Sequence, residues 1–205
     1  MTAALLALSV WAAEPTPLRT AVDAGTVTAE LRGNGSSTGD AIFATLKSTG
    51  GEATLSIESG TVLTAASAEA PRMVVAASKG RMLGYGWFQP ATEMTVAPTG
   101  STQWVLEAYA VELGKRHPAA DDRYTVGEVD AALATLIAKA GELKSGPAAL
   151  QTAIWASSGD FDLGALKERF PASDETLSAA KKLYQSAGKD PCAHQLWAAG
   201  CTPQP

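Results

Sequence analysis

The hydrophobic pattern of this chain changes once, near Pro118, and this change constrains the fold more than any other feature of the sequence. From residue 27 to about residue 113, short runs of β-branched and aromatic residues are interrupted by Gly, Pro, Asn or Ser about every eight to twelve residues, which is typical of a sandwich or barrel. After Pro118, apolar residues recur at helical spacing. Strands followed by helices, without βαβ alternation, predict an α+β fold: an N-terminal antiparallel β-sandwich or barrel, then a C-terminal bundle of about four short helices.

The first block contains the predicted strands and one Gly-rich segment. The strands are expected at 26–31, 42–46, 53–57, 61–63, 73–76, 82–88, 94–97 and 104–111. Residues 33–40 are rich in Gly and Ser but lie between two of these strands rather than in front of a helix. A hairpin turn is therefore favoured over a phosphate-binding loop.

Start and stop signals divide the second block into helices. Residues 125–128 have the form of a capping box in front of an apolar stripe at 129–140, and Gly141 or Gly146 can end that helix. Pro147 suits the first position of a second helix, and Gly159 suits the residue after its end. A third helix is expected at 163–170 with Asp162 as its cap, and a fourth from Ser173 to Gly188.

The termini indicate export. An apolar run at 3–10 is followed by small residues, but Lys and Arg are missing before Arg19. Two interpretations compete: a secretory signal whose start lies upstream of Met1, which we favour, or the apolar helical N-terminus of a cytosolic protein. The resulting division is a signal peptide at 1–13, a linker at 14–25, the β part at 26–113, the helical part at 114–190 and a C-terminal tail at 191–205. The expected location is secreted, periplasmic or at the cell envelope.

The two cysteines, Cys192 and Cys201, agree with export. In an oxidising compartment they would close a small loop and stabilise the fold by about 2.5–3 kcal/mol. A metal site that recruits His194 would have an incomplete ligand set, and the spacing matches no zinc pattern. A disulfide is thus favoured over a metal site and over two buried thiols.

Charge and composition exclude several classes of partner. The 205 residues carry a net charge of −5, which argues against nucleic acid and against adsorption to anionic membranes. An apolar run of about twenty residues is missing, so a membrane span is not expected. The expected partner is an unidentified protein or glycan at a cell surface.

Catalytic constellations are scarce. His117 lies in a polar connector, where a solvated side chain is favoured over a catalytic one. Asp121 and Asp122 offer adjacent carboxylates without the spacing of a calcium loop. Sequence motifs of hydrolases, phosphate-binding loops and zinc proteases are missing. The chain is therefore predicted to be no enzyme and to carry no cofactor or metal.

The motif Leu-Gln-Thr-Ala-Ile-Trp at 150–155 is the most specific signal in the second block. Gln151 and Trp155 are four residues apart and share a helix face. Together with Leu-Glu-Ala-Tyr-Ala-Val at 106–111 and the strand block from 39–42 through 60–63 to 72–75, this motif resembles the thioester domains of bacterial surface proteins. The resemblance covers about residues 25–165. In that family a cysteine in an extended segment, next to a tyrosine, bonds to the glutamine of a Gln-x-Ala helix.

The resemblance implies a chemistry that this chain lacks. In the family, a thiolate attacks the glutamine carboxamide and ammonia leaves, which gives a thioester that can acylate an amine on a partner surface. Here Ala110, beside Tyr109, stands where the resemblance places the cysteine. Gln151 is then expected to be a buried carboxamide with backbone partners near the Tyr109 strand. Tyr109, Ala110, Gln151 and Trp155 are the remnants of the motif.

Two function classes stay open. The first is an exported, non-catalytic adhesion or interaction module on a thioester-domain-like scaffold. The second is a secreted or periplasmic protein or enzyme that holds a small ligand or carbohydrate in a pocket between sheet and helices. The aromatic candidates for that pocket are Tyr85, Trp87, Trp104, Tyr109 and Trp155. A pocket that exposes two or more of these rings favours the second class, and a filled core with Gln151 against Ala110 favours the first.

Overall fold

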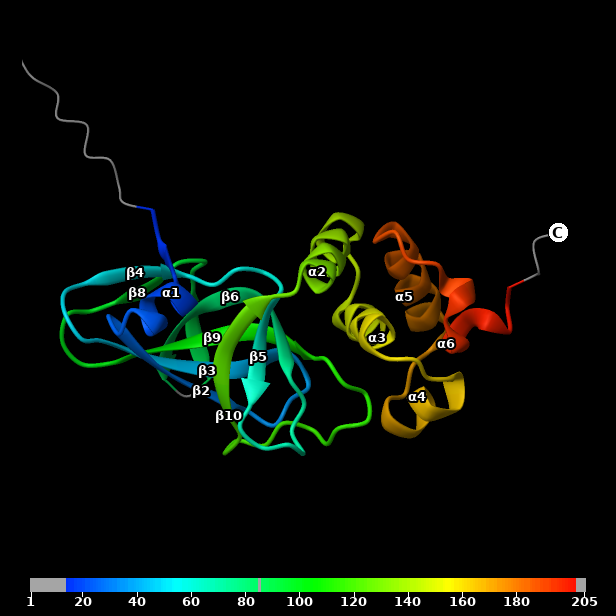
Figure 1. Ribbon diagram of the computed structural model, residues 1–205, viewed down its shortest axis with the longest axis horizontal. Helices are drawn as coiled ribbons and strands as arrows, with labels where there is room; N and C mark the ends of the chain where they lie inside the picture. Colours follow the sequence, from blue (N-terminus) through cyan, green and yellow to red (C-terminus); the bar gives the residue numbers. More distant parts are fainter. Residues whose placement is uncertain (1–13, 85, 202–205) are drawn as a thin grey trace, which may run out of the picture.

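The computed structural model describes residues 14–84 and 86–201. The strands occupy one end of the molecule and the helices that follow them in the sequence occupy the other, as Figure 1 shows, so the predicted α+β order is confirmed. The proposed signal peptide at 1–13 lies outside the described residues. Among the residues that are described, no helix has the length and apolar character needed to cross a bilayer.

The β part is a closed barrel of antiparallel strands. The hydrogen-bonded order is β5-β10-β2-β3-β9-β6, and pairing of β5 with β6 closes the ring. The barrel strands are β2 (Val27–Gly33), β3 (Thr38–Ser48), β5 (Thr61–Ala65), β6 (Met73–Gly84), β9 (Thr102–Ala110) and β10 (Arg123–Val129). Side chains of alternate residues point inward, and on β9 these are Trp104, Leu106, Ala108 and Ala110.

A second, small sheet closes one end of the barrel. It consists of β1 (Thr16–Pro17), β4 (Ala53–Ser56) and β8 (Met94–Val96), and β1 leads into helix α1 (Leu18–Asp23). Leu18 and Ala21 of this helix are buried in the barrel core. The expectation of a linker at 14–25 was therefore wrong, because two apolar residues one turn apart are sufficient to anchor a short helix against a large core.

Strand β10 replaces the predicted capping box. Thr125 to Glu128 are extended and pair with β5, so that β10 bridges β5 and β2 and completes the ring. Helix α2 (Ala131–Leu143) instead begins after Asp130, whose carboxylate accepts hydrogen bonds from the amides of Ala132 and Leu133. Its end is also different, because Lys144 adopts the left-handed conformation at φ 51°. The β part thus extends to Val129, beyond the predicted boundary at 113.

The segment 82–88, predicted as one strand, is a hairpin. β6 continues to Gly84, and β7 (Trp87–Pro90) returns antiparallel to it. Gly84 and Gly86 have φ of 120° and 84°, a region that costs little only for glycine. The 33–40 segment is also a hairpin turn, as expected, between β2 and β3.

The helices after α2 follow the predicted punctuation closely. Pro147 is the first residue of α3 (Pro147–Ser158), and Asp162 and Ser173 cap α4 (Leu163–Arg169) and α5 (Asp174–Ser186). A 3₁₀ turn (Pro191–Ala193) and α6 (Gln195–Ala198) are the last elements of the described residues. The predicted disulfide is confirmed: Cys192 and Cys201 are bonded, with their Cα atoms 5.6 Å apart.

Candidate functional site

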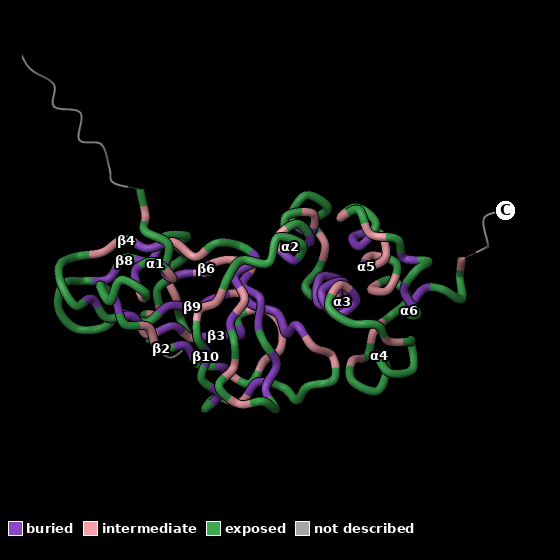
Figure 2. Tube along the Cα trace, viewed as in Figure 1, coloured by how far each residue is buried: buried purple, intermediate pink, exposed green. Residues whose placement is uncertain are grey.

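Helix α3 lies between the barrel and the other helices. Figure 2 shows it as a largely buried segment, and eight consecutive residues from Ala149 to Ala156 are buried. Leu150, Ala153 and Ile154 pack with Tyr109 and Val111 at the end of β9, whereas Trp155 and Ala156 pack against α4, α5 and α6. A helix that is buried on every side is a central element of a core. Two polar side chains on it, Gln151 and Thr152, are nevertheless fully buried, and the Thr152 hydroxyl donates to the Ala148 carbonyl of the same helix at 2.9 Å.

The Gln151 carboxamide, unlike the Thr152 hydroxyl, binds outside its own helix, to the last residue of β9. It is fully buried, at 0% exposure. Its Nε2 donates to the Ala110 carbonyl at 2.7 Å, and its Oε1 accepts from the Ala110 amide at 3.1 Å and from the Thr38 hydroxyl at 2.9 Å. Because Gln151 pairs with both backbone groups of Ala110, it acts at this point as a neighbouring strand would.

Tyr109, the neighbour of Ala110, faces the helices. It is 1% exposed, and its hydroxyl donates to Glu107 Oε1 at 2.6 Å. Burial, and then the hydrogen bond to Glu107, raise the pKa of Tyr109 above its ordinary value. Tyr109 is therefore a neutral donor in the packed interface between β9 and α3.

Trp155 lies one turn after Gln151 and borders two spaces. It is 7% exposed and meets Phe170 edge to face at 5.7 Å between ring centroids. Its buried Nε1 has no hydrogen-bond partner among the described residues. The smaller space, about 20 Å³, also touches Ala110 and His117, and this volume suffices for one water.

The larger space is a groove between the barrel and the helices. It measures about 370 Å³ and lies between the segment after β9 and helices α3 and α4. Its apolar wall includes Leu113, Trp155 and Phe161, and its rim carries the charged residues Glu112, Asp160, Glu168 and Arg169. Glu112 is engaged, because it accepts from the Arg72 guanidinium at 2.5 Å.

The aromatic candidates do not gather in this groove. Among the candidates that the structure describes, Trp155 alone lines it; Trp104 lies inside the barrel, and Trp87 is 77% exposed on the β6–β7 hairpin. Tyr85 lies outside the described residues. The criterion of two exposed candidate rings is not met, although Phe161, which the sequence reasoning did not single out, adds a second ring.

The connector 111–122 holds His117 and the two aspartates. His117 is exposed, with Nδ1 2.7 Å from the Ser37 hydroxyl. Asp122 is buried and accepts from Arg116 through both guanidinium Nη atoms, at 2.7 and 2.6 Å, and from the Ala119 amide. Within the described ranges there is no cluster of three or more His, Cys, Asp and Glu residues that could hold a metal ion. Asp122 is thus a structural carboxylate that ties the connector together.

This ion pair predicts an acid-sensitive contribution to stability. The Arg116 hydrogen bonds hold the pKa of Asp122 below its ordinary value. The stabilisation should therefore be fully present above about pH 4, the unfolded-state pKa, and disappear as the pH falls through the lower folded-state pKa. Asp122→Asn should lower the free energy of unfolding by about 1.5–3 kcal/mol near neutral pH in urea titrations. Asp121→Asn, at the exposed neighbouring position, is the control. If the difference in unfolding free energy between wild type and Asp122→Asn stayed constant down to acid pH, this assignment of Asp122 would be wrong.

His194 is buried and structural. Its Nδ1 accepts from the Leu196 amide at 3.1 Å, so Nε2 carries the proton and donates to the Gly159 carbonyl at 2.9 Å. Its ring contacts Phe161 and Trp197, with centroids at 5.1 and 5.4 Å. Both nitrogens are engaged, so the structure offers no support for the metal alternative at Cys192 and Cys201.

The site is therefore a buried carboxamide against the end of β9, with a groove beside it. Comparisons with protein families, with curated proteins and with solved structures found no match to this chain, so its geometry alone guides the functional interpretation.

Proposed function

We propose that this protein is an exported, non-catalytic adhesion or interaction module whose scaffold is like that of thioester domains but lacks the reactive cysteine. The observation that supports this most is the contact of Gln151 with Ala110, two residues 41 positions apart in the chain. The carboxamide lies against the position where the resemblance places a thiol. Its hydrogen-bonding groups are used by the backbone, which gives Gln151 a structural role.

Export is part of this proposal. The disulfide between Cys192 and Cys201 persists in oxidising compartments and is rare in the cytosol, which supports a secreted, periplasmic or envelope location. The expected partner is a protein or glycan at a cell surface. Neither acylation nor any other covalent step is assigned to the chain as it stands, because Ala110 carries no nucleophile.

Restoring the thiol tests the scaffold. In Ala110→Cys, the new thiolate should attack the Gln151 carboxamide carbon; a sulfur–carbon bond forms, the carbon–nitrogen bond breaks, and nitrogen leaves as ammonia with the proton of the thiol. Intact-mass measurement under non-reducing conditions should therefore give a mass lower than calculated by one ammonia. A thiol reagent should find no free thiol.

Two controls make this result specific. The double variant Ala110→Cys, Gln151→Ala should keep its calculated mass and show a free thiol. A thiol placed elsewhere on the same strand, Gln103→Cys, should also keep its calculated mass, because Gln103 is exposed and lies at the opposite end of β9 from Ala110. If folded Ala110→Cys keeps its calculated mass and a free thiol, the thioester-like interpretation is wrong.

The groove supports a second candidate, a small-ligand-binding protein. A volume of about 370 Å³ with Trp155 and Phe161 on its wall and charged residues on its rim has the size and lining of a ligand site. Thermal-shift measurements with simple sugars and primary amines should then raise Tm. Ala165→Trp, which fills the groove from α4, should abolish the shift in Tm. A shift that survives this substitution, or the lack of any shift in wild type, would contradict ligand binding in the groove.

A further inference from the structure

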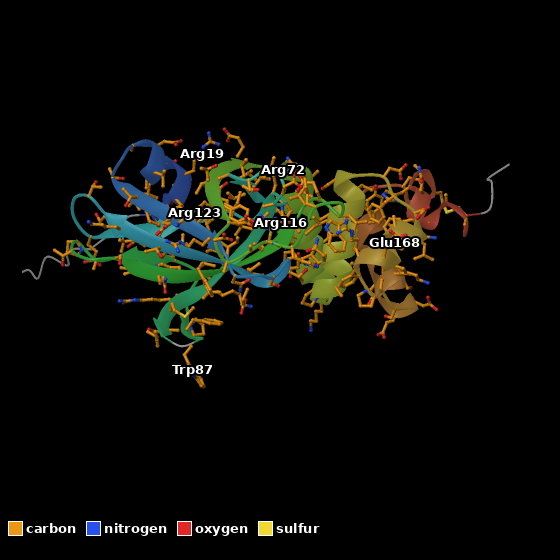
Figure 3. The ribbon with its side chains drawn as sticks, turned by 90° about the horizontal axis from the view of Figure 1, so that it is seen from below. Arg19, Arg72, Trp87, Arg116, Arg123 and Glu168 are labelled. Atoms are coloured by element: carbon orange, nitrogen blue, oxygen red, sulfur yellow. A yellow bond between two sulfur atoms is a disulfide. The ribbon has the colours of Figure 1, made fainter. Side chains whose placement is uncertain are left out.

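The β6–β7 hairpin carries the largest exposed apolar side chains among the described residues. Trp87 is 77% exposed and Leu83 is 66% exposed, whereas the other exposed large apolar residues, Val129, Leu143 and Leu163, lie between 36% and 41%. In Figure 3 the hairpin projects from the barrel, with Trp87 at its outer end. Single exposed apolar residues are ordinary, but two of this size on one projecting turn indicate a contact surface.

The tip is uncharged, and a cation follows directly at its base. Residues 82–88, Met-Leu-Gly-Tyr-Gly-Trp-Phe, contain no charged side chain, and Arg81 precedes them. Arg81 makes no ion pair within the described chain, whereas Lys79 two residues earlier is engaged with Glu107 at 3.4 Å. An apolar tip above a free guanidinium matches the layering of a phospholipid surface, with acyl chains inside and phosphates at the interface.

The backbone of the hairpin also suits an apolar environment. β6 and β7 are paired as far as Gly84 and Trp87, so their backbone N–H and C=O groups have hydrogen-bond partners close to the turn. Backbone groups without partners are costly in hydrocarbon, and this pairing reduces that cost. Trp is the side chain most suited to the interface itself, because it combines a large apolar ring with one polar N–H.

We propose that the Trp87 hairpin inserts its tip into the interface of a phospholipid membrane and attaches the protein to that surface peripherally. The described residues beside Trp87, which are Leu83, Gly84 and Gly86, carry no polar side chain, so burial of apolar surface in lipid is the contact that they favour. A lipid surface also fits better than a deep protein pocket, because the tip is convex and its apolar residues are spread over both sides of the turn. The net charge of −5 opposes adsorption by charge, so apolar insertion drives the contact.

Vesicle sedimentation tests this proposal with the full chain. Wild type should partition onto phosphatidylcholine vesicles, and the double variant Trp87→Ala, Leu83→Ala should lower the partition coefficient about tenfold or more. Arg81→Gln should lower it by a smaller factor, about two- to fivefold, because one phosphate contact is lost. The matched control Val129→Ala, Leu163→Ala removes exposed apolar residues elsewhere and should bind as wild type does.

A second measurement locates the contact. Vesicles whose acyl chains carry bromine should quench wild-type tryptophan fluorescence, and Trp87→Phe should remove most of that quenching while much of the binding persists. Wild type that stays in the supernatant at millimolar lipid would overturn the proposal and favour a protein partner for the tip. Equal binding by wild type and the folded Trp87→Ala, Leu83→Ala variant would also overturn it.

Discussion

Replacing Gln151 by Ala should lower the free energy of unfolding by about 3–5 kcal/mol. The substitution removes the donor to the Ala110 carbonyl, the acceptor of the Thr38 hydroxyl and a fully buried side-chain volume. The Ala110 amide keeps a partner, the Ser37 carbonyl at 2.8 Å, so the main cost falls on the carbonyl and on the cavity. Urea unfolding followed by circular dichroism measures the change.

Two further variants separate these contributions. Gln151→Met preserves most of the volume but none of the hydrogen bonds. We therefore expect it to lower the free energy of unfolding by at least half as much as Gln151→Ala does. Gln185→Ala removes an exposed glutamine from helix α5 and should change the stability by less than about 0.5 kcal/mol. If Gln151→Met were as stable as wild type, volume rather than hydrogen bonding would explain the buried glutamine.

Local signals were sufficient to predict helices α3, α4 and α5. Pro147, Asp162 and Ser173 each fix a helix start through their own backbone or side-chain chemistry, so neighbours in sequence decide the outcome. The disulfide was equally local, because nine positions separate Cys192 from Cys201. Features whose cause lies within about ten residues were therefore accessible from the sequence.

Features that depend on residues far apart in the chain could not be predicted from the sequence. Residues 125–128 have the pattern of a capping box, yet barrel closure requires a strand there, between β5 and β2, and Asp130 takes over the cap. The same limit applies to the site. The sequence placed Gln151 against Ala110 only through a resemblance, and it missed Thr38, which lies 113 positions from Gln151. Phe161 in the groove also lacked any local signal, since its role depends on how α3 and α4 meet the barrel.

Gly60→Ala should be the other strongly destabilising substitution, with an expected loss of about 3–4 kcal/mol in the free energy of unfolding. Gly60 has φ 90°, and an added Cβ would lie 2.6 Å from the Ala134 Cβ and 3.0 Å from the Asp130 carbonyl oxygen. This turn joins the barrel to the start of α2, because Gly60 also accepts a hydrogen bond from the Asp130 amide at 2.9 Å. The new methyl group would push α2 away from the barrel.

A matched glycine isolates the packing cost from the backbone cost. Gly25 has φ 68° with nothing within 4 Å of an added Cβ, so Gly25→Ala should cost only about 1 kcal/mol. The double variant Gly60→Ala, Ala134→Gly removes the closest clash. Although glycine in a helix has its own cost, the double variant should lose about 1 kcal/mol less unfolding free energy than the sum of the two single variants. Equal losses for Gly60→Ala and Gly25→Ala would mean that the backbone conformation alone is responsible. The barrel–helix junction would then tolerate the methyl group. In that case contacts other than the close approach of α2 to the Gly60 turn would hold the helices against the barrel.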